Sequence, residues 1–340
     1  MVTGAAGFIG RHVVDELAAE GWAVRALDLE MPGASVESER GGASPVEWSK
    51  VDIRDEAALE PLLGDAEVVV HLASAHLQHR APPGWYESVN VDGTRNLVGL
   101  AAAAGVRRFV HVSSVGIYGH VSDPPADEDA PKHPTNDYER TKLLGETAAL
   151  ELSRDVGMEL VVLRPAWVYG SGCPRTARLL RTVRRGRFFY VGAGANLRHP
   201  VHVSDAVRAI LLAIDAPSAS TGQPYLVVGP EAASVRQLVE TCARVQGVRP
   251  PRLRLPRALV ASGLRGVELG FALLGKAPPV SRRSLAFFEH DNAFDGAAAA
   301  RDLGFEPRVG LEAGLQMTLR PPLPAAVTAR NAGGVPGGTT

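Results

Sequence analysis

Short apolar runs alternate with longer amphipathic stretches through the first half of the chain. Apolar runs bounded by turn-forming residues predict strands, and apolar positions repeated every three or four residues predict helices. By these criteria the strands fall at residues 22–27, 67–72, 108–113 and 159–164, and the helices at residues 8–20, 85–104 and 138–156. This alternation predicts an α/β fold, a doubly wound parallel sheet with helices on both faces. Such sheets bind ligands at the carboxyl ends of their strands.

The second half of the chain is less regular and predicts a different kind of unit. The pattern predicts a basic helix at 175–187, an apolar run at 188–191, a strand at 225–228, a helix at 234–246 with Ser234 as its N-cap, and a proline-rich connection at 249–256. The apolar stretch 258–275 contains Arg265 and Glu268, which favours an amphipathic helix over a membrane span. We therefore expect no transmembrane segment.

These patterns divide the chain into two lobes and a tail. We expect a Rossmann-type dinucleotide-binding domain over residues 1–170, with its sheet completed by later segments. Residues 171–320 are expected to form mainly a smaller C-terminal α/β lobe that binds the substrate. Residues 321–340 have the composition of a disordered tail.

A glycine-rich turn opens the chain, with Gly4, Gly7 and Gly10 spaced three residues apart. The first glycine permits a tight turn, the second allows the backbone to approach a phosphate, and the third allows the next helix to pack closely. The amide-rich start of that helix would face a pyrophosphate. Only Met1 and Val2 precede the motif Thr3 to Gly10, so either the first strand is short or the start of the protein lies upstream.

An acidic residue follows at the spacing that a dinucleotide site requires. Asp28 ends the predicted strand 22–27 and lies 18 positions after Gly10, close to the roughly 20 residues expected for a ribose-binding carboxylate. Its charge would accept hydrogen bonds from ribose hydroxyls and repel a 2′-phosphate, which favours NAD over NADP. The simpler alternative is an aspartate that caps a turn at the strand end.

Tyr138 and Lys142 lie four positions apart on a predicted helix and therefore share one face. A nearby ammonium lowers the pKa of a phenol, which can then exchange a proton with a substrate hydroxyl or carbonyl. Ser113 and Ser114 end the strand at 108–113, where a hydroxyl can orient the reacting oxygen. Of the two, Ser114 is the predicted catalytic residue and Ser113 its structural neighbour. Together these groups predict hydride transfer to or from a nicotinamide.

Composition and charge narrow the class of protein. The 340 residues are 45% hydrophobic and 21% charged, which is typical of a soluble globular protein. A net charge of −1 provides no basic footprint for nucleic acid. Cys173 and Cys242 form neither a disulfide framework nor a metal-ligand pattern, so we expect no metal and a reducing cytoplasmic location. The N-terminus lacks the pattern of a signal peptide.

The ordered motifs resemble the extended short-chain dehydrogenase/reductase family, also called the NAD-dependent epimerase/dehydratase family. The resemblance covers about residues 1–320. Its motifs are the opening glycine turn, Asp52-Ile53, His71 to Ser74, Asn90 to Asn96, Ser113-Ser114, Tyr138 with Lys142, Leu163 to Pro165, Val168 to Gly170 and His202 to Asp205.

The resemblance implies roles for individual residues. Ser114, Tyr138 and Lys142 become the catalytic triad, with Lys142 also on the nicotinamide ribose. The implied NAD contacts are Gly4, Gly7, Phe8, Ile9, Gly10, Asp28, Asp52, Ile53, Leu72, Ala73, Ser74, Asn90, Tyr138, Lys142 and Pro165. Of these, Asp52 and Ile53 are the implied contacts with the adenine. The family commonly forms homodimers through a four-helix bundle, which implies the helices at 85–104 and 138–156.

Departures from the family pattern narrow the reaction. Dehydratases carry an Asp-Glu pair where this chain has Val115 and Gly116, so dehydration is not expected. Trp167 offers an aromatic wall where sugar-nucleotide epimerases often have Asn. Residues 277–283 and 303–307 resemble the branch containing 3β-hydroxysteroid dehydrogenases, although the second element also occurs in sugar epimerases. Arg198 lies where sugar-nucleotide enzymes often bind a pyrophosphate, with a surface ion pair as the alternative.

Two further features have open interpretations. His76 lies after the predicted strand at 67–72, where it either lines the substrate site or sits in a solvated loop. The basic run at 175–187 is interpreted as a solvated helix face, with attraction of an anionic substrate as the alternative.

Three functions follow from the sequence in order of preference. The first is an NAD-dependent oxidoreductase that acts on a secondary alcohol or ketone of a small molecule, of hydroxysteroid or alkyl-ketone type. The second is a nucleotide-sugar epimerase with tightly bound NAD. The third is a non-catalytic dinucleotide sensor, which is disfavoured because such relatives often lose the Tyr/Lys pair.

Overall fold

The computed structural model describes residues 1–31, 45–76, 81–273 and 285–320, and its centre is a seven-stranded parallel sheet. The sheet order is β11-β6-β5-β4-β1-β2-β3. Its strands are β1 (Val2–Thr3), β2 (Val24–Asp28), β3 (Val46–Lys50), β4 (Val68–His71), β5 (Arg108–Val112), β6 (Glu159–Pro165) and β11 (Pro224–Val227). The predicted doubly wound α/β fold is confirmed, and β1 is the short central strand that the sequence allowed.

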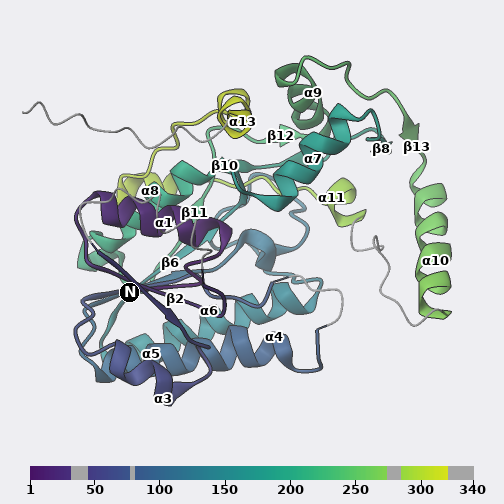
Figure 1. Ribbon diagram of the computed structural model, residues 1–340. Coiled ribbons are helices and arrows are strands. Elements are labelled where there is room, and N and C mark those ends of the chain that lie inside the picture. The colour runs from purple at the N-terminus through teal and green to yellow at the C-terminus, as the bar shows by residue number, and fades with distance from the viewer. Residues whose placement is uncertain (32–44, 77–80, 274–284, 321–340) are drawn as a thin grey trace, which may run out of the picture.

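Helices cover both faces of the sheet (Figure 1). One face is covered by α1 (Phe8–Ala19) and α8 (Val203–Ile214), and the other by α3 (Glu56–Leu59), α5 (Gly93–Ala103) and α6 (Asp137–Val156). Helix α1 turns Val13, Val14 and Leu17 inward because these apolar residues recur at helical spacing. Burial of apolar side chains between these layers drives the fold.

The predicted helix over 85–104 is present but irregular. It consists of α4 (Trp85–Glu87), the π-helical η2 (Ser88–Asp92) and α5. Helix α6 approaches η2 so closely that a Cβ at Gly145 would overlap the carbonyl oxygen of Asn90. The irregular turn therefore lies where the two helices meet most tightly, which the apolar repeat alone does not reveal.

The C-terminal lobe consists of a second group of short helices and strands. It contains β7 (Trp167–Tyr169), α7 (Pro174–Arg184), β8 (Tyr190–Val191), β9 (Leu197–Arg198), β10 (Pro200–His202), β12 (Ala233–Ser234), α9 (Val235–Val245), β13 (Arg254–Leu255), α10 (Arg257–Leu273), α11 (Ala286–Glu289) and α13 (Leu311–Leu319). Helix α12 (Ala297–Leu303) instead packs against β11 of the main sheet and against α8. Ser234 caps α9 as predicted, within a reciprocal capping box.

The two lobes are interleaved along the chain. Strand β11 pairs with β6 in the main sheet, and α8 packs against α1, so the chain returns to the first domain after residue 200. The division at residue 170 remains a prediction, with later segments completing the sheet as expected. The predicted tail at 321–340 lies outside the described residues. No helix in the described part of the chain is long and apolar enough to cross a membrane.

Candidate active site

The glycine turn between β1 and α1 has the geometry that the sequence predicts. Gly4 has a φ of +68°, and a Cβ there would come within 2.6 Å of the Ala73 backbone nitrogen. A Cβ at Gly10 would overlap the carbonyl oxygen of Gly4, so the third glycine lets α1 pack onto the turn. Gly7 is the N-cap of α1 and is exposed, and Phe8 and Ile9 form the first turn of that helix.

The uncapped amides at the start of α1 and the carboxylate of Asp28 are polar groups that lie beside the glycine turn. No side chain caps the first amides of α1, and no acidic residue lies in its first turn. These amides and the helix dipole suit a diphosphate. The Asp28 carboxylate ends β2 and accepts hydrogen bonds from Ala6 N at 2.9 Å and Glu30 N at 3.2 Å. The turn, the amides and the carboxylate together fit a dinucleotide, and the assignment of Asp28 to its ribose remains a prediction.

Asp52 and Ile53 follow β3 but have different environments. The Asp52 carboxylate pairs with the Arg54 guanidinium at 2.5 Å, and this contact lowers the pKa of Asp52. Ile53 is buried against Gly93, where a Cβ would come within 2.8 Å of the isoleucine side chain. Their assignment to the adenine remains a prediction.

The loop after β4 is held in place by Asn90. The Asn90 side chain accepts hydrogen bonds from Ser74 Oγ at 3.0 Å and Ala75 N at 2.7 Å. Its amide nitrogen donates to Thr141 Oγ1 on α6 at 2.9 Å. Leu72 and Ala73 run directly beside the glycine turn. Asn90 therefore ties the loop at residues 72–74 to the helix that carries Tyr138, and its direct contact with NAD remains a prediction.

Ser114, Tyr138 and Lys142 come together at the carboxyl end of β5. Ser114 Oγ accepts a hydrogen bond from Gly116 N at 3.0 Å, at the start of the short helix η3 (Val115–Tyr118). The Ser114 side chain also acts on the Tyr138 phenol and lowers its pKa. Lys142 is buried and donates from Nζ to the carbonyl oxygen of Val112 at 2.8 Å. The structure thus places all three predicted catalytic residues in one site.

The charge that acts on Tyr138 differs from the expected one. Burial raises the pKa of Tyr138, and the charge of Arg175 and the hydrogen bond with Ser114 offset this rise only in part. Lys142 is not among the groups that shift this pKa here, and its ammonium donates to the Val112 carbonyl, so its predicted effect on Tyr138 remains a prediction. Sequence reasoning missed Arg175, which it treated as part of a solvated helix face. The signal was its position in the first turn of α7, directly after a glycine-containing loop.

His76 lies against the catalytic tyrosine. Its ring centroid is 5.0 Å from that of Tyr138, although the residue as a whole is exposed. Desolvation together with the charges of Arg175 and Lys142 lowers the pKa of His76 to about 4. The imidazole is therefore neutral at physiological pH and can offer a hydrogen bond at the site entrance. Its role in substrate binding remains a prediction.

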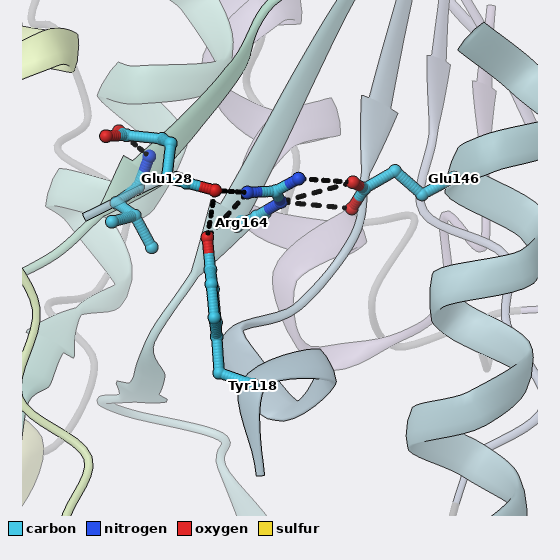
Figure 2. Close-up of polar contacts among 5 residues, drawn as sticks. Tyr118, Glu128, Glu146 and Arg164 are labelled. Atoms are coloured by element: carbon cyan, nitrogen blue, oxygen red, sulfur yellow. Dashed lines mark hydrogen bonds and ion pairs between the residues drawn. The ribbon is translucent and has the colours of Figure 1, made fainter. Parts of the chain in front are cut away.

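A buried ionic network supports the catalytic helix (Figure 2). Glu146 lies one turn after Lys142 and binds the Arg164 guanidinium at 2.6 Å, with both residues 2% exposed. Arg164 also donates to Tyr118 Oη at 2.5 Å and to the Glu128 carbonyl oxygen at 2.9 Å. Burial lowers the pKa of Lys142 to about 8, and the Glu146 charge opposes that shift. Glu146 lies four residues after Lys142 in the sequence, and this spacing was the signal that could have predicted its charge beside the lysine.

Two buried polar groups beside the site are unpaired in the part of the chain that the structure describes. Ser113 Oγ has no hydrogen-bond partner there, and neither nitrogen of His111 has one. His111 faces His71 across β4 and β5 at 5.3 Å between ring centroids. Burial lowers the pKa of His71 to about 3 and that of His111 well below 6.5, so both rings are neutral. Ser113 Oγ is thus available for a hydrogen bond with a substrate oxygen, and its role in substrate binding remains a prediction.

The remaining predicted residues lie where β6 ends and the second lobe begins. Pro165 is buried as the last residue of β6. Trp167 on β7 packs 6.2 Å from Tyr169 and 6.2 Å from Phe287, between ring centroids. Arg198 is buried, hydrogen-bonds Asn292 and lies 4.9 Å from the Phe287 ring centroid, so the surface ion pair is excluded. Burial lowers the pKa of Arg198 to about 10.

A doubly wound parallel sheet with this glycine turn and this Ser, Tyr and Lys arrangement is typical of enzymes that bind a dinucleotide. Residues 1–229 match the NAD dependent epimerase/dehydratase family, and the chain belongs to that family. It is accordingly an NAD-dependent enzyme. The steroid-branch segment at 277–283 lies outside the described residues.

Known relatives act on different substrates. The chain is 28% identical to a 3beta-hydroxysteroid-dehydrogenase/decarboxylase of Arabidopsis thaliana, with 94% of this chain and 78% of the relative covered. It is also 28% identical to the N-acetyl-alpha-D-glucosaminyl-diphospho-ditrans,octacis-undecaprenol 4-epimerase of Escherichia coli O157:H7, covering 94% of each chain. The solved structure of MoeE5 with UDP-glucuronic acid and NAD superposes with a TM-score of 0.72 at 28% identity, covering 93% of this chain and 96% of that one.

Proposed function

We propose that the protein is an NAD-dependent oxidoreductase that interconverts a secondary alcohol and a ketone on an apolar substrate of hydroxysteroid or alkyl-ketone type. The observation that carries the proposal is the position of Ser114 at the carboxyl end of β5 next to the Tyr138 side chain on α6, with Lys142 Nζ bound to the Val112 carbonyl at 2.8 Å. Bound NAD supplies the hydride acceptor or donor at its nicotinamide.

Each catalytic residue has a task that follows from its contacts. Tyr138 exchanges a proton with the substrate oxygen, and its raised pKa keeps the phenol protonated and ready to donate when a ketone is reduced. Ser114 Oγ orients that oxygen and stabilises the charge that develops on it. Lys142 Nζ donates to the Val112 carbonyl; in this proposal its ammonium contributes positive charge behind the tyrosine and holds the nicotinamide ribose.

Aromatic side chains support an apolar substrate. Three aromatic rings lie in a row, which we call the aromatic edge. The ring centroids of Trp167 and Phe287 are 6.2 Å apart, and those of Phe287 and Phe288 are 5.1 Å apart. Such an edge favours contact with a hydrocarbon skeleton over contact with a free sugar. The name of the Arabidopsis relative, a hydroxysteroid dehydrogenase, supports the same substrate class.

Exchange of Tyr138 for phenylalanine tests the catalytic assignment. Tyr138→Phe removes the proton donor and leaves the glycine turn intact, so turnover should fall by about 100-fold or more while NAD affinity stays close to the wild-type value. Turnover of 3β-hydroxysteroids and alkyl ketones, and NAD binding by calorimetry, are the two readouts. Turnover at the wild-type rate would show that Tyr138 is not the proton donor.

A nucleotide-sugar epimerase is the second candidate, and buried Arg198 favours it. An arginine held by Asn292 and stacked on Phe287 is pre-organised to bind a diphosphate. Mass spectrometry of the nucleotide released on denaturation separates the candidates. Tightly retained NAD at about one per chain would favour the epimerase, since its hydride returns to the same substrate. Reversibly bound NAD would favour the dehydrogenase, and NADP would contradict the role proposed for Asp28.

We also propose that the protein is a homodimer formed through the helices at 85–104 and 138–156. Helices α5 and α6 lie side by side on one face of the sheet, and Leu144 on α6 is 39% exposed (Figure 1). Leu144→Glu should shift the mass measured by light scattering from dimer to monomer. A wild-type protein that is monomeric at micromolar concentration would overturn this proposal.

A further inference from the structure

Helix α10 lies at the side of the molecule, away from the main sheet (Figure 1). None of its described side chains is buried, and Leu259 is 60% exposed. A Cβ added at any of its three glycines would meet no atom within 4 Å. By contrast, Gly145 and Gly314 in other helices are in close contact with neighbours. Helix α10 is therefore an apolar helix whose surface is largely uncovered by the described part of the chain.

Positive charge surrounds this helix. Residues 249–273 contain five arginines and one acidic residue, Glu268, although the whole chain has a net charge of −1. All five are exposed: Arg249, Arg252, Arg254, Arg257 and Arg265. Arg257 pairs with Glu289 at 2.7 Å, which leaves the segment strongly basic.

A second basic element is joined to the first by strand pairing. Strand β13 pairs with β8, and Tyr190 N donates to the Leu253 carbonyl oxygen at 2.9 Å. Beside this pairing Phe189 is 36% exposed and Leu253 is 57% exposed. Residues 165–204 contain no aspartate or glutamate, and their exposed arginines on or just after α7 are Arg175, Arg178, Arg181, Arg184, Arg185 and Arg187. We call α7, the β8–β13 pair and α10 together the basic-apolar face.

The basic-apolar face borders the candidate active site. Arg175 in the first turn of α7 acts electrostatically on Tyr138. The aromatic edge that starts at Trp167 also continues toward this face, since the ring centroids of Phe288 and Phe188 are 6.0 Å apart. A series of ring contacts thus links Trp167 to the basic-apolar face through Phe287, Phe288 and Phe188.

We propose that the basic-apolar face binds the surface of an anionic phospholipid bilayer. Exposed arginines attract the lipid head groups, and Phe189, Leu253 and Leu259 enter the boundary of the acyl chains, as interfacial amphipathic helices do. The exposed leucine and phenylalanine side chains favour a lipid surface over nucleic acid, which offers no apolar layer. Both curated relatives named above act on molecules with a hydrocarbon skeleton, a hydroxysteroid and an undecaprenol diphosphate, by their names. The proposal concerns binding alone and holds whichever reaction the site catalyses.

Vesicle co-sedimentation of the full chain tests the proposal. The protein should bind phosphatidylcholine–phosphatidylglycerol vesicles, should bind pure phosphatidylcholine vesicles far more weakly, and should be released in part by salt. With about a fivefold effect for each arginine near the surface, R178Q/R181Q/R265Q should weaken binding by about 100-fold. L253S/L259S should also weaken binding, because these side chains supply the apolar contact.

Matched controls separate this face from general effects of charge and hydrophobicity. R95Q/R107Q/R301Q removes the same charge from exposed positions on other elements, and M317S/L319S removes two exposed apolar side chains from α13. Both controls should bind vesicles like the wild-type protein. Equal loss in the control and test variants, or no binding to anionic vesicles at low salt, would overturn the proposal. Binding that R178Q/R181Q/R265Q abolishes and L253S/L259S leaves unchanged would also overturn it, since it would indicate a site for soluble polyanions.

Discussion

Replacement of Glu146 by glutamine should destabilise the protein through the charge that it leaves behind. The Arg164 guanidinium is 2% exposed and has three contacts with the Glu146 carboxylate, at 2.6, 3.2 and 3.2 Å. Its other partners, Tyr118 Oη and the Glu128 carbonyl, are neutral acceptors. Loss of one partner of a buried pair costs about 3–5 kcal/mol. Because glutamine keeps one acceptor oxygen, we expect the low end, about 3 kcal/mol.

Urea unfolding followed by fluorescence measures this loss. With a slope near 3 kcal/mol per molar urea, Glu146→Gln should lower the midpoint by about 1 M. Glu151→Gln is the matched control, because Glu151 lies on the same helix and is exposed. Its midpoint should stay within about 0.2 M of wild type, since surface substitutions change stability by about 0.5 kcal/mol or less.

A double variant identifies the cause of the loss. Glu146→Leu combined with Arg164→Met removes both charges, and Tyr118 Oη still donates to the Glu128 carbonyl at 3.1 Å. Replacement of a buried pair by apolar groups is often neutral, so the double variant should be more stable than Glu146→Gln. A double variant that is no more stable would refute the explanation by an uncompensated charge. A Glu146→Gln midpoint equal to that of the control would refute the value assigned to the pair.

The remaining predictions concern packing and proton binding. Gly10→Ala should weaken both folding and NAD binding, because the added Cβ would overlap the Gly4 carbonyl oxygen. Gly99→Ala should stabilise α5 by about 1 kcal/mol, because a Cβ at Gly99 would meet no atom within 4 Å. The urea midpoints of both variants test this contrast. The pKa of Lys142 is about 8 in the folded protein against 10.5 for a free lysine. The unfolded chain therefore binds more protons between these values, so the stability of wild type relative to Lys142→Met should rise from about pH 8 to about pH 10.5; a flat difference in unfolding free energy would contradict the shift.

Local patterns predicted most strands of the main sheet, because the apolar pattern of each element is complete within a few neighbouring residues. The apolar runs around β4, β5 and β6 and the helical repeat of α1 each depend on neighbours in sequence. Strand β3 (Val46–Lys50) was missed because it lies at the sheet edge, and its two apolar residues, Val46 and Trp48, alternate with Glu47 and Ser49. An edge strand has partners on one side only, so its sequence need not be apolar throughout.

Spacing also identified which catalytic side chains share a face, but not what surrounds them. Tyr138, Lys142 and Glu146 follow each other at four-residue intervals on α6, and the first two were predicted as a pair. That Arg164 neutralises Glu146 depends on β6 passing behind the helix. Long-range contacts of this kind follow from the assembled fold and leave no short motif.

The electrostatics of Tyr138 show how the assembled fold changes a correct motif. The spacing correctly brings Lys142 into the site, where its Nζ donates to the Val112 carbonyl at 2.8 Å. The positive charge that offsets the desolvation of the phenol comes from Arg175, in a helix of the second lobe. A change in the position of α7 would therefore change the pKa of Tyr138 without any change in α6. If the basic-apolar face binds a bilayer, the bound surface includes α7, the helix whose Arg175 acts on the pKa of Tyr138.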